Sequence, residues 1–140
     1  MARGLVQVKY SQFFDRDAVL KGLERSEARL LSRAGAFVRT RARRSIRKRK
    51  RISVAGKPPS SHTGFYRKSI LFGYDKKNRS VVIGPSANFG GAEVPSLLEF
   101  GGRGKYRGKT AIYKARPHMA PALEAERENF PTLFTNSLRN

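Results

Sequence analysis

Residues 15–51 read DRDAVLKGLERSEARLLSRAGAFVRTRARRSIRKRKR, and this stretch decides the fold because it is long, periodic and increasingly basic. Apolar residues recur three or four positions apart from Val19 to Ile46, which places them on one side of an α-helix. A helix of about 35 residues is roughly 50 Å long, which is more than the width of a globule of 140 residues. We therefore predict one long amphipathic helix whose basic C-terminal end projects from the body.

The basic end of this stretch is a dense run of cations that repel one another unless an acidic surface meets them. Few aromatic residues interrupt the run, so contact with nucleic acid would be made to the phosphate backbone without sequence preference. A solvated helix end, phosphate binding and docking on an acidic protein surface all remain open. The run consists of Arg39, Arg41, Arg43, Arg44, Arg47, Lys48, Arg49, Lys50 and Arg51.

The overall charge also indicates an acidic partner. The chain contains 30 Lys and Arg against 10 Asp and Glu, which gives a formal net charge of +20. No apolar stretch approaches the ~20 residues that cross a bilayer, so no membrane partner is expected. Cysteine is absent, which excludes disulfides and thiolate metal sites. The length predicts a single domain over residues 1–140, with a projecting basic helix end and loop at about residues 39–64.

The rest of the chain predicts short elements joined by loops. Residues 65–74 and 80–84 flank a short polar turn, which is typical of a β-hairpin. The fold class that follows is α+β: a long N-terminal helix and a C-terminal helix packed on a small, mostly antiparallel sheet, with extended loops. The other predicted elements are a strand within residues 5–10, an exposed loop at 52–64, a short helix at 94–100, a basic glycine-rich loop at 101–109, a strand at 110–114 and a helix at 119–129.

No arrangement of residues in the sequence predicts an enzyme. The two histidines, His62 and His118, do not have the spacing of a metal site, and the glycines after residue 100 lack the GxxxxGK[ST] phosphate-binding pattern. His62 is expected to be a polar loop residue, and Glu99 an ordinary surface or subunit ion pair. We therefore predict no catalytic residue, no metal ion, no cofactor and no small-molecule substrate.

Four stretches follow the long helix in a defined order: GKPPSSHTGFYRKSI at residues 56–70, VVIGP at 81–85, SLLEFGG at 96–102 and ARPHMAPALEAE at 115–126. In this order they resemble the small neck and tail-completion proteins of long-tailed bacteriophages, which are often described as minor tail components or virion morphogenesis proteins. The resemblance spans nearly the whole chain. The family usually carries a bulky aromatic residue where this chain has His118, so the local packing there is expected to differ.

The resemblance implies an α+β subunit that assembles into a ring, commonly a hexamer, between the tail tube and the head connector. Its expected partners are further copies of the chain, the connector or stopper and tail tube proteins, and DNA in the channel. The expected location is the head–tail junction of the virion, after assembly in the host cytoplasm, with no enzymatic step. The alternative function is that of a sequence-independent nucleic-acid-binding protein that uses the Arg- and Lys-rich helix end.

A closed ring of identical subunits needs heterologous contacts, in which one face of a subunit meets a different face of the next. The predicted subunit or partner interface comprises Pro58, Pro59, His62, Leu98, Glu99, Phe100, Arg116 and Pro117. The predicted contacts with nucleic acid or an acidic partner are the nine cations of the basic run together with Arg103, Lys105 and Arg107.

Overall fold

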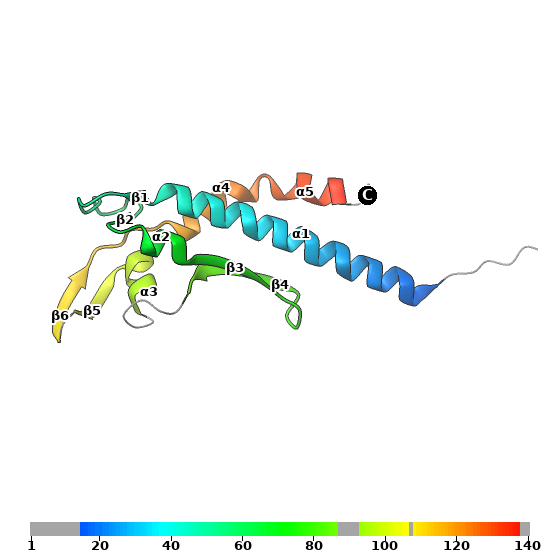
Figure 1. Cartoon of the computed structure of the whole chain (residues 1–140), viewed down its shortest axis with the longest axis horizontal. Coiled ribbons are helices and arrows are strands. Elements are labelled where there is room, and N and C mark those ends of the chain that lie inside the picture. Colours follow the sequence, from blue (N-terminus) through cyan, green and yellow to red (C-terminus); the bar gives the residue numbers. More distant parts are fainter. Residues whose placement is uncertain (1–14, 87–92, 107, 138–140) are drawn as a thin grey trace, which may run out of the picture.

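The computed structural model describes residues 15–86, 93–106 and 108–137, and its elements are arranged along one long helix, α1 (Arg16–Ser45) (Figure 1). Asp15 begins the helix as its N-cap, because its Oδ1 accepts a hydrogen bond of 3.0 Å from the backbone N–H of Ala18. The carboxylates of Asp15 and Asp17 also lie at the positive end of the helix dipole. The predicted long N-terminal helix and the α+β fold class are confirmed.

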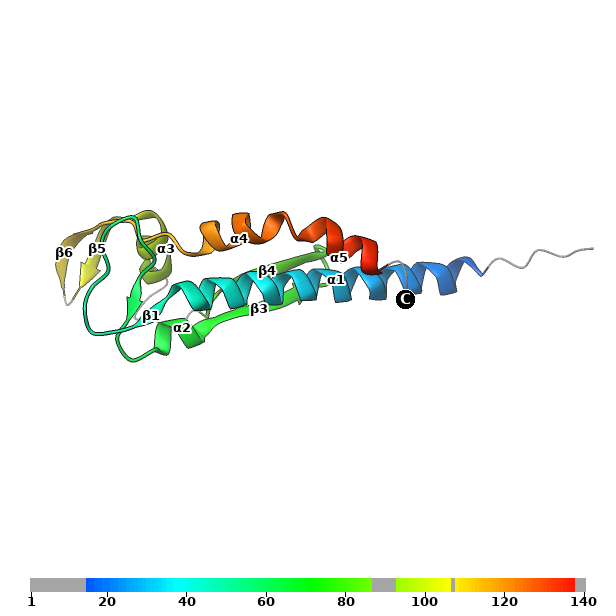
Figure 2. The ribbon, with the colours of Figure 1, turned by 90° about the horizontal axis from the view of Figure 1, so that it is seen from above.

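The helix ends at Ser45, six residues before the predicted end near Arg51. Ile46 is extended and only 1% exposed, so its side chain enters the core. The next two residues form β1 (Arg47–Lys48), which pairs in parallel with β2 (Ser60–Ser61). Burial of Ile46 and this pairing outweigh a longer helix in which like charges three and four positions apart repel. The basic end thus lies within the body, and the N-terminal end of α1 extends beyond its neighbours (Figures 1 and 2).

Two layers flank α1 (Figures 1 and 2). On one side lies the antiparallel hairpin of β3 (Ile70–Asp75) and β4 (Ser80–Pro85), and on the other lie α4 (Met119–Arg127) and α5 (Phe130–Ser137). The register pairs Phe72 with Ile83 and Tyr74 with Val81, and the predicted hairpin is confirmed. Residues 65–69, which were expected in the first strand, form the short helix α2 (Phe65–Ser69).

The core follows the apolar stripe of α1. It is widest where the C-terminal half of the helix meets α2, the start of β3 and α4. The N-terminal part of the same stripe has nothing packed over it among the described residues, and every residue from Asp15 to Arg25 is exposed. The buried apolar residues are Leu30, Ala34, Val38, Ala42, Ile46, Tyr66, Ile70 and Ala122.

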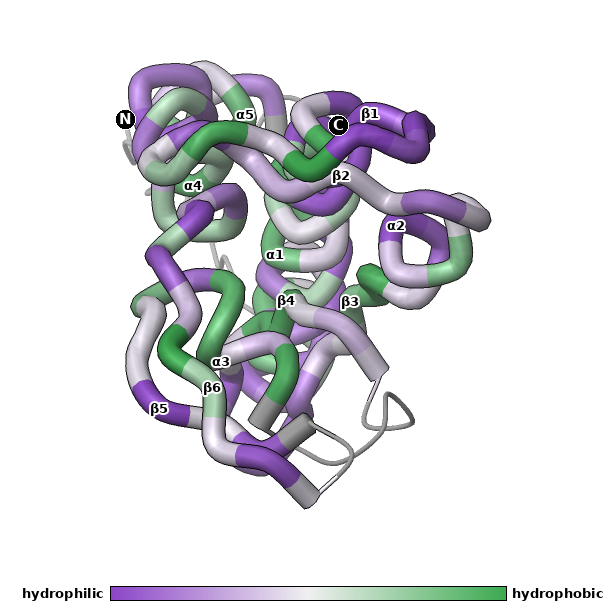
Figure 3. Tube along the Cα trace, turned by 90° about the vertical axis from the view of Figure 1, so that its left-hand side faces the viewer, coloured by the Kyte–Doolittle hydropathy of each residue, from purple (hydrophilic) through white to green (hydrophobic). Residues whose placement is uncertain are grey.

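The remaining elements gather at the end of the molecule opposite the N-terminus of α1 (Figures 1 and 3). They are α3 (Glu93–Phe100), which confirms the predicted short helix, and the antiparallel pair β5 (Gly102–Tyr106) and β6 (Lys109–Tyr113). The prediction of a loop at residues 101–109 is therefore wrong, because residues 102–106 form β5 and Lys109 begins β6. Gly104 permits this arrangement, since a Cβ there would collide with Leu97 of α3.

The described residues contain three separate two-stranded sheets, two antiparallel and one parallel, instead of one small sheet. The β3–β4 hairpin contacts α1 and α2, whereas β5 contacts α3. The strand predicted within residues 5–10 lies outside the described residues.

Candidate functional site

Three arginines of the basic run contact other parts of the same chain. Arg39 lies with its Cζ 5.1 Å from the centre of the Phe72 ring, and Arg41 donates from Nε to Glu126 Oε1 at 2.5 Å. That bond is the main reason that the pKa of Glu126 is lowered. Arg43 donates to two backbone oxygens where α2 meets β3, at 2.6 and 3.0 Å. These three side chains attach α1 to the hairpin and to α4, and their predicted contact with nucleic acid or an acidic partner stays a prediction.

The other cations of the run are exposed at the end of the molecule that carries β1 (Figure 3). Arg103 and Lys105 are also exposed on β5, while Arg107 lies outside the described residues. None of the exposed cations of the run forms an ion pair within the described part of the chain. They are Arg44, Arg47, Lys48, Arg49, Lys50 and Arg51.

Five cations from two segments meet around one pocket of about 610 Å³, which we call the basic pocket. Arg49, Lys50 and Arg51 come from the segment after β1, and Lys114 and Arg116 from the segment after β6. Among the described residues, no acidic side chain lines it. The rest of its lining is neutral and partly apolar: Ile52, Ser53, Pro59, Ser60, His62, Leu98, Ile112 and Tyr113.

Hydrogen bonds to neutral oxygens hold the basic pocket in shape. Arg49 donates from Nε to Ser60 Oγ at 2.9 Å, and Arg116 donates from Nε to the Ser53 backbone oxygen at 3.1 Å. The backbone N–H of Gly56 donates to the Ala115 oxygen at 2.8 Å. The segment expected as an exposed loop at residues 52–64 is therefore anchored, and some of its side chains are buried. Because the acceptors are uncharged, they do not neutralise the arginines.

The basic pocket brings together residues from both predicted sets. Pro59, His62, Leu98 and Arg116 of the predicted interface line it beside Arg49, Lys50 and Arg51 of the basic run. Sequence reasoning missed Ile52, Ser53, Ile112 and Lys114, since nothing in the local pattern of two distant segments shows that they are neighbours. Pro58 and Pro117 are half-buried outside this lining, and Phe100 at the end of α3 is 80% exposed.

Glu99 has an internal role that differs from the predicted surface or interface ion pair. Its carboxylate accepts hydrogen bonds from the backbone N–H groups of His118, Met119 and Ala120, at 3.0, 3.1 and 2.9 Å. These groups begin α4 and have no acceptor within the helix, so Glu99 acts as its cap from another element. Burial alone would raise the pKa of Glu99, but the three backbone bonds outweigh it and lower the pKa. The interface prediction for Glu99 is corrected accordingly.

Glu99 also completes a buried polar chain with His118 and Tyr66. His118 Nδ1 lies 3.0 Å from Glu99 Oε2, and its Nε2 lies 3.0 Å from the Tyr66 hydroxyl. This geometry fits a neutral imidazole that donates from Nδ1 to the Arg116 backbone oxygen, at 3.3 Å, and accepts at Nε2 from the Tyr66 hydroxyl. Burial lowers the pKa of His118 and raises the pKa of Tyr66 well above its ordinary range. His118 is 1% exposed and lines none of the pockets described here, so we assign this chain a structural role.

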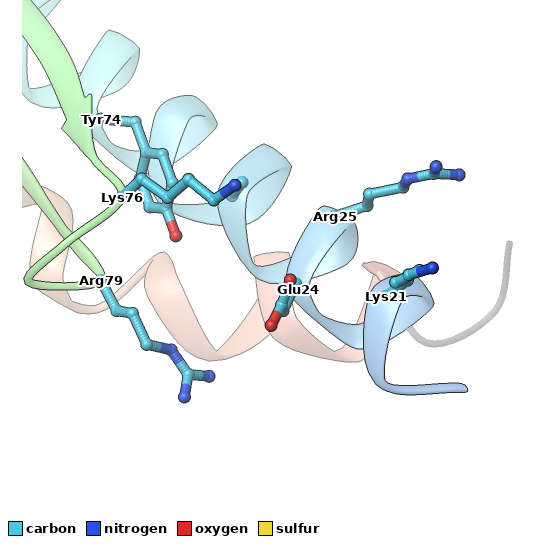
Figure 4. A pocket seen from close by; sticks show the side chains of 7 residues that line it. Lys21, Glu24, Arg25, Tyr74, Lys76 and Arg79 are labelled. Atoms are coloured by element: carbon cyan, nitrogen blue, oxygen red, sulfur yellow. The ribbon is translucent and has the colours of Figure 1, made fainter. Parts of the chain in front are cut away.

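A second pocket of about 440 Å³ lies between the N-terminal half of α1 and the tip of the β3–β4 hairpin (Figure 4). Its charges are mixed: Lys21 and Arg25 of α1 lie beside Glu24, and Arg79 of the hairpin pairs with Glu27. An anion would meet carboxylates here, which the basic pocket does not present. The basic pocket is therefore the stronger candidate site.

The described residues contain no group of three or more His, Asp or Glu that could hold a metal ion. Across residues 15–86, 93–106 and 108–137, none of the helices combines the length and the apolar character needed to span a bilayer. Comparisons with models of protein families, with curated proteins and with solved structures found no match. The resemblance to phage neck proteins therefore stays a prediction, and any function has to be argued from the geometry.

Proposed function

We propose that the chain is a structural subunit of a bacteriophage neck, which assembles into a ring around the DNA channel and joins the tail to the head connector. The observation that supports this proposal is that the subunit leaves apolar side chains uncovered at both of its ends. No enzymatic step is part of the proposal. The choice of a phage neck rests on the order of motifs along the chain, which resembles that of the neck and tail-completion proteins.

The first uncovered surface is on the N-terminal part of α1. Val19, Leu20 and Leu23 are 44%, 46% and 55% exposed, although they continue the stripe that buries Leu30 and Val38. Among the described residues, no element covers this part of the helix (Figure 2). Because burial of an apolar side chain stabilises by about 1.5–3 kcal/mol, such a stripe is well suited to contact another subunit.

The second surface is at the opposite end of the molecule, around β6 and the segment between β1 and β2 (Figure 1). Val54 and Phe100 are 74% and 80% exposed there, outside the lining of the basic pocket. A subunit with two different apolar surfaces at opposite ends is suited to heterologous contacts, and these form a closed ring when the rotation between subunits closes. The proposed ring uses the first surface of one copy and the second surface of the next.

The alternative function, sequence-independent nucleic-acid binding, is favoured by one observation. Six cations of the basic run are exposed and unpaired within the described part of the chain. If all six met phosphates, the slope of log K against log salt would be about −5. The apolar surfaces have no role in this alternative, and we rank it second for that reason.

The experiment that tests the proposal is restoration of tail joining. Particles made without the chain should separate into DNA-filled heads and free tails, and added protein should restore joined particles visible by electron microscopy. Leu23→Ser should fail to restore joining and should lower the mass of the oligomer in light scattering, because it removes apolar contact area. The matched control is Val82→Ser, since Val82 is 64% exposed on the hairpin and outside both surfaces.

Normal joining in the absence of the chain would overturn the proposal. Equal effects of Leu23→Ser and Val82→Ser would remove the assigned role of the α1 surface. A monomer that coats duplex DNA with a salt slope of about −5 would replace the proposal with the alternative.

A further inference from the structure

The basic pocket has a charge that the molecule does not neutralise. Five cations line it, no carboxylate does, and none of the five forms an ion pair within the described residues. Arg49 and Arg116 are already oriented by hydrogen bonds to Ser60 and to the Ser53 backbone. Guanidinium groups fixed in this way lose little freedom when a carboxylate binds, which favours a specific anionic ligand over loose ion pairing.

The lining of the basic pocket also contains a buried hydroxyl group, that of Ser53, without a hydrogen-bond partner among the described residues. Ser53 is 3% exposed. Buried hydroxyls almost always have a partner in folded proteins. Because Ser53 belongs to the lining of the basic pocket, a ligand bound there would supply this partner.

Apolar side chains indicate what kind of anion binds. Ile52 and Ile112 both line the basic pocket, and they are 77% and 78% exposed. A phosphate backbone would leave these isoleucines in water, because protein–nucleic acid interfaces are polar. A peptide that carries both carboxylates and apolar side chains would bury them. The partly buried Leu98 of α3 adds to the apolar part of the lining.

We propose that the basic pocket binds an extended acidic segment of a partner protein, with carboxylates on Arg49, Arg51 and Lys114 and an apolar side chain between Ile52 and Ile112. This deepens the proposed function and rests on it for the origin of the partner, which would be an acidic component of the connector or tail tube. The recognition chemistry itself depends only on the basic pocket.

The test is binding of a fluorescent peptide of alternating glutamate and leucine to the full chain at physiological ionic strength, measured by anisotropy. The same peptide with glutamine for glutamate should not bind. The double variant Arg51→Glu, Lys114→Glu should weaken binding at least about tenfold, since tenfold corresponds to the loss of one good ion pair. The matched control is Arg29→Glu, Arg33→Glu, which makes the same charge change on exposed residues of α1 and should weaken binding less than about threefold.

Ile112→Asn separates a peptide from nucleic acid. Its side chain is exposed, so the variant should fold normally, bind the peptide at least about threefold more weakly and bind duplex DNA as before. The inference would be overturned if the pocket double variant and the control double variant lost equal peptide affinity. It would also be overturned if the chain bound DNA through Arg51 and Lys114 but did not bind the peptide. Because no particle is involved, failure here leaves the tail-joining test unaffected, and failure of tail joining leaves a measured peptide affinity in place.

Discussion

Replacing Glu99 by alanine should destabilise the fold, although Glu99 does not itself line the basic pocket. The substitution removes an acceptor shared by three backbone N–H groups at the start of α4. One of these groups is the backbone N–H of His118, a residue that is 1% exposed. The change therefore removes a helix cap and leaves a buried backbone donor without its carboxylate partner, while His118 Nδ1 keeps the Arg116 backbone oxygen at 3.3 Å.

The magnitude follows from these two losses. Loss of a helix cap costs about 1 kcal/mol, and a buried donor left poorly paired costs about 1–3 kcal/mol. We expect the free energy of unfolding to fall by about 3 kcal/mol, which lowers the melting temperature by roughly 10 °C for a chain of this length. Glu99→Gln keeps one acceptor oxygen without the charge and should lose about half as much.

Urea unfolding followed by circular dichroism measures these differences. The matched control is Glu124→Ala on α4, the helix that Glu99 caps; the Glu124 side chain is 65% exposed, and its carboxylate lies 3.6 Å from Arg127. Exposed pairs of this kind contribute less than about 1 kcal/mol, so the control should unfold close to the native chain.

The reasoning would be refuted if Glu99→Ala unfolded within about 0.5 kcal/mol of the native chain, the range of neutral surface changes. If that variant also failed to assemble, the result would support the prediction that Glu99 lies in the subunit interface. A loss equal to that of Glu124→Ala would likewise show that the carboxylate is not a buried cap.

Two further measurements test the buried contacts. The pKa of His118 is lowered in the folded chain, so the unfolded chain binds this proton first as pH falls below 6.5, and the free energy of unfolding should decline below that pH. The pKa of Tyr66 is raised, so the free energy of unfolding should also decline above pH 10.0, where the unfolded chain loses this proton first. An acid-side decline that is unchanged in His118→Phe would contradict the role given to His118. Gly35→Ala should destabilise by about 1–2 kcal/mol, because a Cβ there would lie 2.6 Å from Val81 Cγ2 and overpacking outweighs the helix propensity gained. Gly22→Ala is its control, since nothing lies within 4 Å of that Cβ, and equal unfolding midpoints for the two variants would rule out the close contact.

Periodic signals in the sequence were enough to predict the main elements. The three- and four-residue spacing of apolar positions located α1 and its buried face, and the polar turn between residues 65–74 and 80–84 located the β3–β4 hairpin. The short helix predicted at residues 94–100 and the strand predicted at 110–114 correspond to α3 and β6. These signals are local, and each depends on a few neighbouring residues.

The misses depend on distant partners. The helix was predicted to continue past Ser45 because its residue types allow it, but burial of Ile46 and the pairing with β2 ended it. Glycines at residues 101–108 indicated a loop, whereas Gly104 in fact allows β5 to approach Leu97. Glu99 looked like a surface charge because the N–H groups that it accepts lie about twenty positions later in the chain.

The division of the arginine run bears on which partner the chain can meet. Arg39, Arg41 and Arg43 could neutralise phosphates only by giving up contacts that hold α1 to the hairpin and α4. The remaining cations are not a uniform basic face, because three of them join Lys114 and Arg116 around exposed isoleucines. Nucleic acid would satisfy the charge and leave that apolar area in water, whereas an acidic protein segment would satisfy both. In the proposed assembly, the most basic end of this chain of net charge +20 is also one of its apolar ends, so a single acidic partner would cover both.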